Sequence, residues 1–313
     1  MTHPSPPIGE ALSGLEDCPY WLMDGVGNDF VIVDLRGGGK MTADAAQALG
    51  NREGPFGCDQ IITLERLPSI DGQRSAASAL ENENERAGSD TAMGIWNADG
   101  STAGACGNAA RCVGWLLMEE AGTDEVRFGS PGGILNAIRG GNGEITVDMG
   151  EPKLHWRQIP LAEQMDDTRF IDIKLGPIDN PVLWGPSAVS MGNPHCVFFV
   201  PDAEAQALDR FGPMVEHHPL FPEQANVTVA EVREDGTIRA RTWERGVGIT
   251  KACGTAACAT LVSAHRRRMT GREATVVMDG GPLHIDWREA DNHVLMTGAV
   301  TLSGQGVIDP NAP

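Results

Sequence analysis

The sequence predicts an α+β protein built from two similar halves. A glycine-hinged cysteine turn, ACGNAARC at residues 105–112, has a near-copy, ACGTAACA, at residues 252–259. Each copy opens a helical pattern, and VGN at 26–28 is matched in the same order by MGN at 191–193. Sequence motifs that recur in the same order indicate a duplication. A chain of 313 residues is long enough for two hydrophobic cores.

The first half is predicted to be rich in strands, because short β-branched or alternating runs recur along it. One helix is expected over 107–122, directly after Cys106, where apolar residues recur at helical spacing and Gly122 ends the pattern. The expected strands cover residues 30–35, 60–65, 93–98 and 144–150.

The second half repeats this plan. Its helix is expected over 254–268, directly after Cys253, and it ends in three arginines that suit the negative end of the helix dipole. The expected strands cover residues 190–200, 226–232, 237–243, 274–281, 282–287 and 293–300.

Four regions follow from these patterns. Within the first half, the acidic segment of about 66–91 has no apolar periodicity, and we expect it to be a surface insertion. The regions are an N-terminal extension over 1–20, an N-terminal half over 21–140 with Cys106, a C-terminal half over 141–300 with Cys253, and a tail over 301–313.

The amino-acid composition indicates which classes of binding partner the protein has. A net charge of −19 argues against nucleic acid and against an anionic membrane surface, so a small molecule fits better. Because no long apolar run and no basic leader is present, we expect no membrane span and a cytoplasmic location. The seven cysteines, an odd number, do not suggest a disulfide framework. Packing roles are expected for Cys18, Cys58, Cys112, Cys196 and Cys258.

The two repeated cysteines predict a particular chemistry. A sulfur at the start of a helix lies near unpaired backbone N–H groups and the positive end of the dipole, which lower the thiol pKa. The same N–H groups can hold a carboxylate. If two such turns meet around one ligand, a thiolate can remove a proton from an α-carbon while a thiol protonates the opposite face. The configuration then inverts without a metal or pyridoxal cofactor.

Two other chemistries are less consistent with the spacing. Cys106 with Cys112 and Cys253 with Cys258 are spaced C-x5-C and C-x4-C, unlike the usual C-x2-C zinc knuckle. A cysteine hydrolase using His195 is conceivable, but spacing alone shows no pair of nucleophile and base. We therefore expect no metal and no cofactor.

Several longer motifs resemble those of the diaminopimelate epimerase family, in order, from about residue 21 to 300. They are DGVGNDFVIVD (24–34), NADGSTAGACGNAARC (97–112), MGNPHCV (191–197), NV (226–227) and WERGVGITKACGTAACA (243–259). The resemblance implies two pseudo-symmetric halves, each a mixed or antiparallel sheet wrapped around a central helix, with the active site in the cleft between them. It also implies a homodimer.

The resemblance further implies an isomerase that interconverts LL- and meso-2,6-diaminopimelate for lysine and peptidoglycan precursors. Cys106 and Cys253 match the catalytic pair, and Glu244 and Arg245 match an acidic and basic pair, with Glu244 also supporting catalysis. His195 is either an orienting group or a packing residue. The substrate-contacting amides are Asn28, Gln60, Asn97, Asn193 and Asn226, and the carboxylate cradle is Gly107, Asn108, Gly254 and Thr255.

Two alternatives stay open at this point. A proline or hydroxyproline racemase would share the two-thiol chemistry but would need no residues to bind a second amino-acid head. A non-catalytic amino-acid-binding protein would keep those residues and tolerate loss of both cysteines.

Overall fold

The computed structural model describes residues 8–67, 90–177 and 179–310, and most of the expected insertion therefore lies outside the described residues. The chain forms two compact units. The first unit comprises Met1–Val147 with Ala299–Pro313, and the second comprises Asp148–Gly298.

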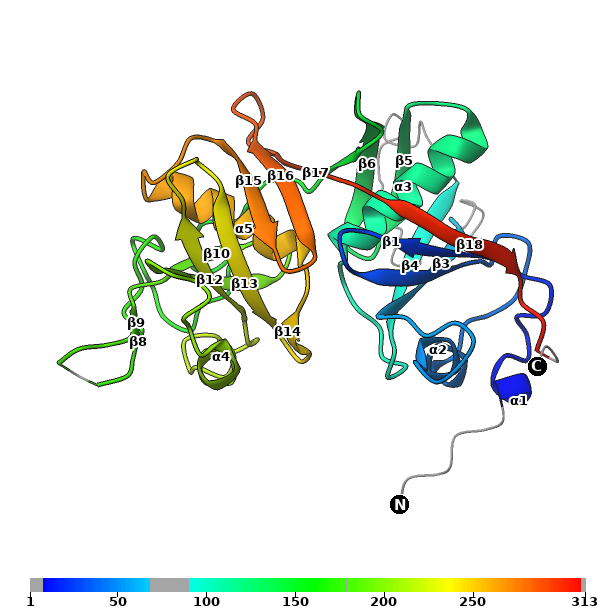
Figure 1. The fold of residues 1–313 in the computed structure, drawn as a ribbon, viewed down its shortest axis with the longest axis horizontal. Helices are drawn as coiled ribbons and strands as arrows, with labels where there is room; N and C mark the ends of the chain where they lie inside the picture. The colour runs from blue at the N-terminus through cyan, green and yellow to red at the C-terminus, as the bar shows by residue number, and fades with distance from the viewer. Residues whose placement is uncertain (1–7, 68–89, 178, 311–313) are drawn as a thin grey trace, which may run out of the picture. The chain divides into compact units, whose positions relative to one another are not determined.

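The first unit contains a mixed sheet whose strands follow the order β7-β6-β5-β4-β3-β2-β1-β18 (Figure 1). Strands β2 and β3 are buried along most of their length, which explains why FVIV and IITL are continuous apolar runs rather than alternating ones. The strands are β1 Pro19–Asp24, β2 Asp29–Asp34, β3 Gln60–Arg66, β4 Thr91–Asn97, β5 Glu125–Ser130, β6 Gly133–Arg139, β7 Ile145–Asp148 and β18 Thr301–Val307.

The second unit contains a sheet of order β10-β11-β12-β13-β15-β16-β17, with β14 beside β13, and a small separate hairpin of β8 and β9. The strands are β8 Lys174–Leu175, β9 Leu183–Trp184, β10 Ser187–Ser190, β11 Pro194–Phe199, β12 Asn226–Val232, β13 Ile238–Glu244, β14 Gly248–Thr250, β15 Glu273–Met278, β16 Gly281–Trp287 and β17 Val294–Gly298.

The strand pairings of the two units match one by one, which confirms the predicted α+β class with two similar halves. In the first unit the pairs β1–β2, β3–β4 and β5–β6 are antiparallel, while β2–β3 and β4–β5 are parallel. The second unit repeats this alternation from β10 to β16, with β13–β15 in the place of β4–β5. Parallel pairs need crossover connections, and helices supply them at corresponding points in both units.

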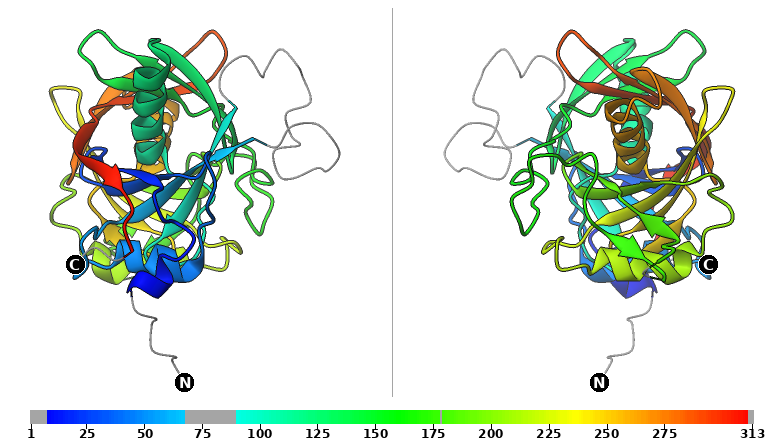
Figure 2. Two further views of the ribbon diagram at one scale, coloured as in Figure 1. Left: turned by 90° about the vertical axis from the view of Figure 1, so that its right-hand side faces the viewer. Right: turned by 90° about the vertical axis from the view of Figure 1, so that its left-hand side faces the viewer.

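One long helix crosses the middle of each unit. Helix α3, Gly107–Ala121, packs on β5 and β6, and α5, Gly254–Arg266, packs on strands from β10 to β17. Figure 2 shows the strands of each unit curving around its helix, α3 in the left-hand view and α5 in the right-hand view. The first eleven residues of α5 are all buried, as is expected of a helix whose small residues let strands approach on every side.

Shorter helices cover the outer faces. Helix α2, Ala43–Gly50, begins at Thr42, whose hydroxyl accepts from the Ala45 N–H at 3.1 Å. It belongs to a core cluster that includes Leu12, Leu15 and Cys18. In the second unit, α4, Leu208–Glu216, connects β11 to β12. The remaining helix is α1, Ile8–Ala11.

The expected extension and tail both differ from the structure. Residues from Leu12 to Cys18 contribute buried side chains to the core, so this part of 1–20 is integral to the first unit. The expected tail over 301–313 is wrong for 301–307, because these residues form β18 and pair antiparallel with β1. The run TLSGQGV is polar and largely exposed, so its sequence lacks the apolar pattern that marks a strand.

Among the residues that the structure describes, no helix combines the length and apolar character needed to cross a membrane.

The close approach of α3 to β6 gives a test of the fold. A Cβ at Gly114 would lie 2.5 Å from the Cβ of Ala137, so Gly114→Ala introduces a clash. We expect a loss of about 1–2 kcal/mol in unfolding free energy, because overpacking outweighs the gain in helix propensity of about 1 kcal/mol. Urea denaturation measures it, with Gly37→Ala, in open space, as control. A stabilised Gly114→Ala protein would contradict the packing.

Candidate active site

The two repeated cysteines occupy the same position in their units, immediately before the long helix. Cys106 is the N-cap of α3 with φ −151° and ψ 100°, and Cys253 is the N-cap of α5 with φ −139° and ψ 109°. Their carbonyls accept the first helical hydrogen bonds, from Ala110 and Ala257, each at 3.0 Å. The N–H groups of a first helical turn have no acceptor within the helix, so backbone N–H groups of the kind that bind anions lie beside each sulfur.

Glycine follows each cysteine and allows a ligand to approach. Gly107 and Gly254 are the first residues of their helices, and Asn108 and Thr255 come next. All four are buried.

In the first unit the predicted amides gather into two hydrogen-bonded pairs. Gln60, the first residue of β3, donates from Nε2 to Oδ1 of Asn97, the last residue of β4, at 2.9 Å. These residues are also register partners across the two strands. Asn108 donates from Nδ2 to Oδ1 of Asn28, which precedes β2. The pairs link strand ends and the helix start that are far apart in sequence.

Two further residues hold the Asn28–Asn108 pair, and the sequence motifs do not indicate either of them. Arg111, fully buried in α3, donates from Nη1 to Oδ1 of Asn108 at 3.0 Å. Asp59 accepts from Nδ2 of Asn28 at 3.3 Å. Arg111 lies three residues after Asn108, a spacing that places both on one helix face, and this is the sequence signal for the contact.

In the second unit a chain of polar contacts leads to Cys253. His195 on β11 contacts Oδ1 of Asn193 through Nε2 at 2.9 Å, and Asn193 donates from Nδ2 to the Thr255 hydroxyl at 3.4 Å. The same hydroxyl lies 3.5 Å from Sγ of Cys253. The strand order and the start of α5 therefore bring Asn193, His195, Thr255 and Cys253 together.

The environment of Cys253 favours the protonated thiol. Burial raises the pKa of the thiol well above its ordinary value, and the nearby Glu244 carboxylate raises it further. The Thr255 hydroxyl and the Ala256 N–H act in the opposite direction, but they do not prevail. The expectation that the helix start alone lowers the thiol pKa is therefore wrong for Cys253, which is 6% exposed. Cys106 is partly exposed.

His195 is a neutral, buried imidazole. Burial lowers its pKa to about 3, and the positive charge of Arg245 acts in the same direction. A neutral ring in contact with an amide oxygen carries its proton on that nitrogen, so Nε2–H donates to Asn193. His195 therefore orients Asn193, and its full burial also gives it a packing role.

The residues at the end of β13 are held by different partners. Glu244 accepts from the Thr250 hydroxyl at 2.6 Å, while Arg245 donates from Nη1 to the Glu223 carbonyl at 2.8 Å. Asn226 donates from Nδ2 to the Pro194 carbonyl and accepts from the Arg245 backbone N–H at 3.0 Å, so this amide fixes the strand ends.

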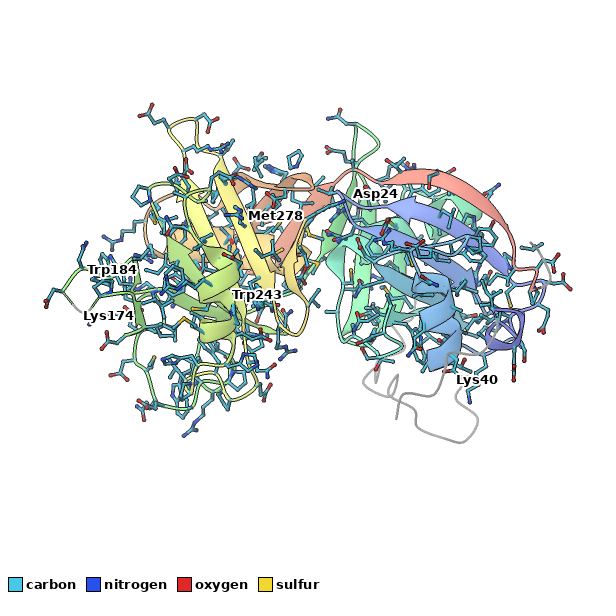
Figure 3. All side chains as sticks on the ribbon, turned by 60° about the horizontal axis from the view of Figure 1, so that its bottom comes forward. Asp24, Lys40, Lys174, Trp184, Trp243 and Met278 are labelled. Atoms are coloured by element: carbon cyan, nitrogen blue, oxygen red, sulfur yellow. The ribbon has the colours of Figure 1, made fainter. Side chains whose placement is uncertain are left out.

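A buried carboxylate outside the predicted set anchors the same turn. Glu216, the last residue of α4, accepts from Nε1 of Trp243 and from the Gly246 N–H, both at 2.7 Å. Trp243 lies beside α4 at Gly212, where a side chain would collide with its ring (Figure 3). Figure 3 also labels Met278, whose Sδ lies 3.4 Å from the backbone nitrogen of Cys253.

The packing cysteines lie as expected. Cys112 and Cys258 are fully buried within α3 and α5, and no cluster of three or more metal-ligand side chains occurs in the part of the chain that the structure describes. The other buried thiols are Cys18, Cys58 and Cys196.

The depressed pKa of His195 predicts a pH dependence of stability. The unfolded imidazole binds a proton near pH 6.5 and the folded one near pH 3, so stability is complete above pH 6.5 and falls on acidification through this window. Between pH 6.5 and 5 the imidazole costs about 1.5–2 kcal/mol of unfolding free energy. Urea titrations at both pH values measure it. His195→Phe should lose less stability over this interval, and an equal loss contradicts the buried neutral ring.

The carboxylate beside Cys253 gives a second prediction. Glu244→Gln removes a negative charge that opposes ionisation, so the pKa of the Cys253 thiol should fall. The ultraviolet absorbance of the thiolate, followed against pH, reports the change after subtraction of a Cys253→Ser spectrum. Glu231→Gln, on β12 of the same unit, is the control and should leave the titration unchanged. An unshifted curve for Glu244→Gln rules out the electrostatic role.

Comparisons with known proteins agree with the motifs. The sequence profile of diaminopimelate epimerase matches residues 20–155 and 187–303. The chain is 47% identical over 292 residues to a diaminopimelate epimerase of Afipia carboxidovorans, covering 92% of this chain and 94% of the relative. It is 46% identical to that of Brucella anthropi, covering 92% and 90%.

Solved structures share the fold at low sequence identity. A hydroxyproline epimerase from Agrobacterium vitis superposes with a TM-score of 0.61 at 16% identity, over 95% of this chain and 92% of that one. A phenazine biosynthesis protein of the PhzF family from Enterococcus faecalis gives 0.59 at 13% identity, over 93% and 99%. Taken with the sequence matches, these findings show that the chain belongs to the diaminopimelate epimerase family.

Proposed function

We propose that this protein interconverts LL- and meso-2,6-diaminopimelate without a cofactor, using Cys106 and Cys253 as the two acid–base groups. The observation that carries the proposal is the equivalence of the two cysteines, each the N-cap of a buried helix in a duplicated unit. Identity of 44–47% to curated diaminopimelate epimerases over most of the chain supports the substrate.

The proton transfer balances between two sulfurs. A thiolate removes the α-proton, and the electron pair spreads into the adjacent carboxylate. The other thiol then gives its proton to the opposite face of the carbon and becomes the thiolate, so the pair is left in the reverse protonation state. Backbone N–H groups at Gly107–Asn108 and Gly254–Thr255 stabilise the charge on the carboxylate.

The surroundings of Cys253 support a division of roles between the two sulfurs. Burial and the Glu244 carboxylate keep Cys253 protonated, so Cys253 begins as the proton donor. In the proposal Cys106, which is partly exposed at the start of α3, is therefore the group that acts first as the base. This assignment concerns the first turnover, because each catalytic event exchanges the two states.

The remaining predicted residues bind the second amino-acid head in this proposal. Diaminopimelate carries an ammonium and a carboxylate far from the reacting carbon, and side-chain amides can accept from the first and donate to the second. Gln60 and Asn97 offer such atoms at adjacent strand ends, and Arg245 supplies a cation. Proline has no second head, so these groups favour diaminopimelate over a proline-type substrate.

The cellular setting is part of the same proposal. The reaction places the protein in the synthesis of lysine and peptidoglycan precursors, which supports a cytoplasmic location. A homodimer is proposed on the family resemblance alone.

Substitution of either cysteine tests the reaction. Cys106→Ser and Cys253→Ser should each lower the rate of LL to meso conversion by at least about 100-fold, because positioned acid–base groups contribute factors of this order. Chiral chromatography measures the conversion, and circular dichroism confirms folding. Cys196→Ser, a buried packing thiol in the same unit as Cys253, is the matched control. Full activity in either catalytic variant contradicts the proposal.

Substrate choice separates the proposal from a racemase of proline or hydroxyproline. We expect α-proton exchange in deuterated water with LL-diaminopimelate and none with L-proline or hydroxyproline, measured by proton NMR. Exchange with proline alone would overturn the assigned substrate while keeping the two-thiol chemistry. Binding of diaminopimelate without any exchange would indicate an amino-acid-binding protein instead.

A further inference from the structure

A basic cavity lies at the end of α5 opposite to Cys253. Its volume is about 640 Å³, which is in the range of ligand sites. It is lined by Arg169, His265, Arg266, Arg268, Thr270 and Trp287, all in the second unit. We propose that this cavity binds a small anion through a phosphate or carboxylate group.

The positive charge of the cavity lining is the first observation that supports anion binding. Three guanidinium groups meet here in a protein whose net charge is −19, and among the described lining residues none is acidic. The neighbouring carboxylate of Asp167 forms an ion pair with Arg169 at 2.8 Å. One carboxylate does not neutralise three cations, so the cavity keeps a net positive charge that attracts an anion.

Buried polar atoms without a hydrogen-bond partner are the second observation that supports anion binding. Nη1 of Arg266 and Nδ1 of His265 are buried, and within the described part of the chain neither has a hydrogen-bond partner. Arg266 uses Nη2 to donate to the Thr168 hydroxyl at 3.0 Å, so its guanidinium is held in one orientation. A buried donor without a partner is costly, and an oxyanion would supply an acceptor to the Arg266 guanidinium.

The helix dipole accounts for only part of this arrangement. The Arg267 side chain is used elsewhere, because it donates to the Gly185 carbonyl at 3.1 Å and stacks on Phe170 at 4.0 Å. Arg169 reaches the cavity from a different segment and has no helix end to compensate. Cations that converge from two segments on one cavity are better explained by a shared ligand.

The Trp287 side chain, which forms one wall of the cavity, is held by several contacts. The Trp287 ring is edge-on to His265, with centroids 5.5 Å apart, and Arg272 covers it at 4.2 Å. Nε1 of Trp287 also donates to the Asn292 carbonyl at 3.1 Å. A fixed aromatic wall beside guanidinium groups suits a compact oxyanion, since the planar guanidinium forks match phosphate and carboxylate oxygens. Trp287 also provides a fluorescent reporter.

Titration calorimetry tests the proposal, with sodium phosphate and sodium succinate as probes at constant ionic strength in chloride. We expect saturable binding of at least one probe, accompanied by a change in tryptophan fluorescence that is lost in Trp287→Phe. Arg266→Gln and Arg268→Gln should each weaken binding by about tenfold or more, because each removes a charged hydrogen-bond donor. Arg268 is exposed, so its variant is informative even if Arg266→Gln fails to fold.

The control is Arg233→Gln, which removes one exposed positive charge elsewhere in the same unit and should leave the affinity unchanged. Binding of phosphate alone assigns a phosphoryl ligand, and binding of succinate alone assigns a dicarboxylate. The proposal is overturned if neither probe binds, or if Arg233→Gln weakens binding as much as Arg268→Gln does. The cysteines take no part in this site, so its failure would leave the proposed epimerase reaction untouched.

Discussion

A cysteine that caps a largely buried helix is the constraint on which each unit depends. The sulfur stands where the chain changes from extended to helical backbone, and its position is fixed only if the helix behind it cannot move. Small residues allow strands to close on α5 from several sides, and Gly114 allows β6 to approach α3. The pairing of β3 with β4 then brings Gln60 and Asn97 together, and in the second unit Glu244 at the end of β13 lies close enough to Cys253 at the start of α5 to raise its pKa.

The two units share backbone geometry but differ in chemistry. In the first, Asn108 is held by the buried guanidinium of Arg111, and Cys106 is partly exposed. In the second, Thr255 takes the place of Asn108, and the closed surroundings of Cys253 favour its thiol. Such an asymmetry suits a reaction that needs one base and one acid, because identical sites would begin with equal proton affinities.

Much of the fold and the cluster could be predicted, because the signals are local. The cysteine turns, the helices after them and the strand runs are visible in sequence, and the amides at strand ends followed from motif resemblance. Strand β18 could not be predicted, since its polar, exposed sequence is a strand only by pairing with β1. Nor could the burial of Arg111 and Glu216, or the raised pKa of Cys253, because these depend on packing between segments far apart in sequence.

The isotope content of early product tests the central claim, that one sulfur removes the α-proton and a second sulfur replaces it. LL-diaminopimelate is incubated in deuterated water and both epimers are recovered at low conversion for mass spectrometry. If two separate groups act, we expect deuterium at the inverted carbon of the meso product and little deuterium in the remaining LL substrate. The reason is that the donor thiol carries solvent deuterium, while the base holds the abstracted proton. Equal labelling of both epimers from the earliest times would contradict it and indicate a single exchanging base.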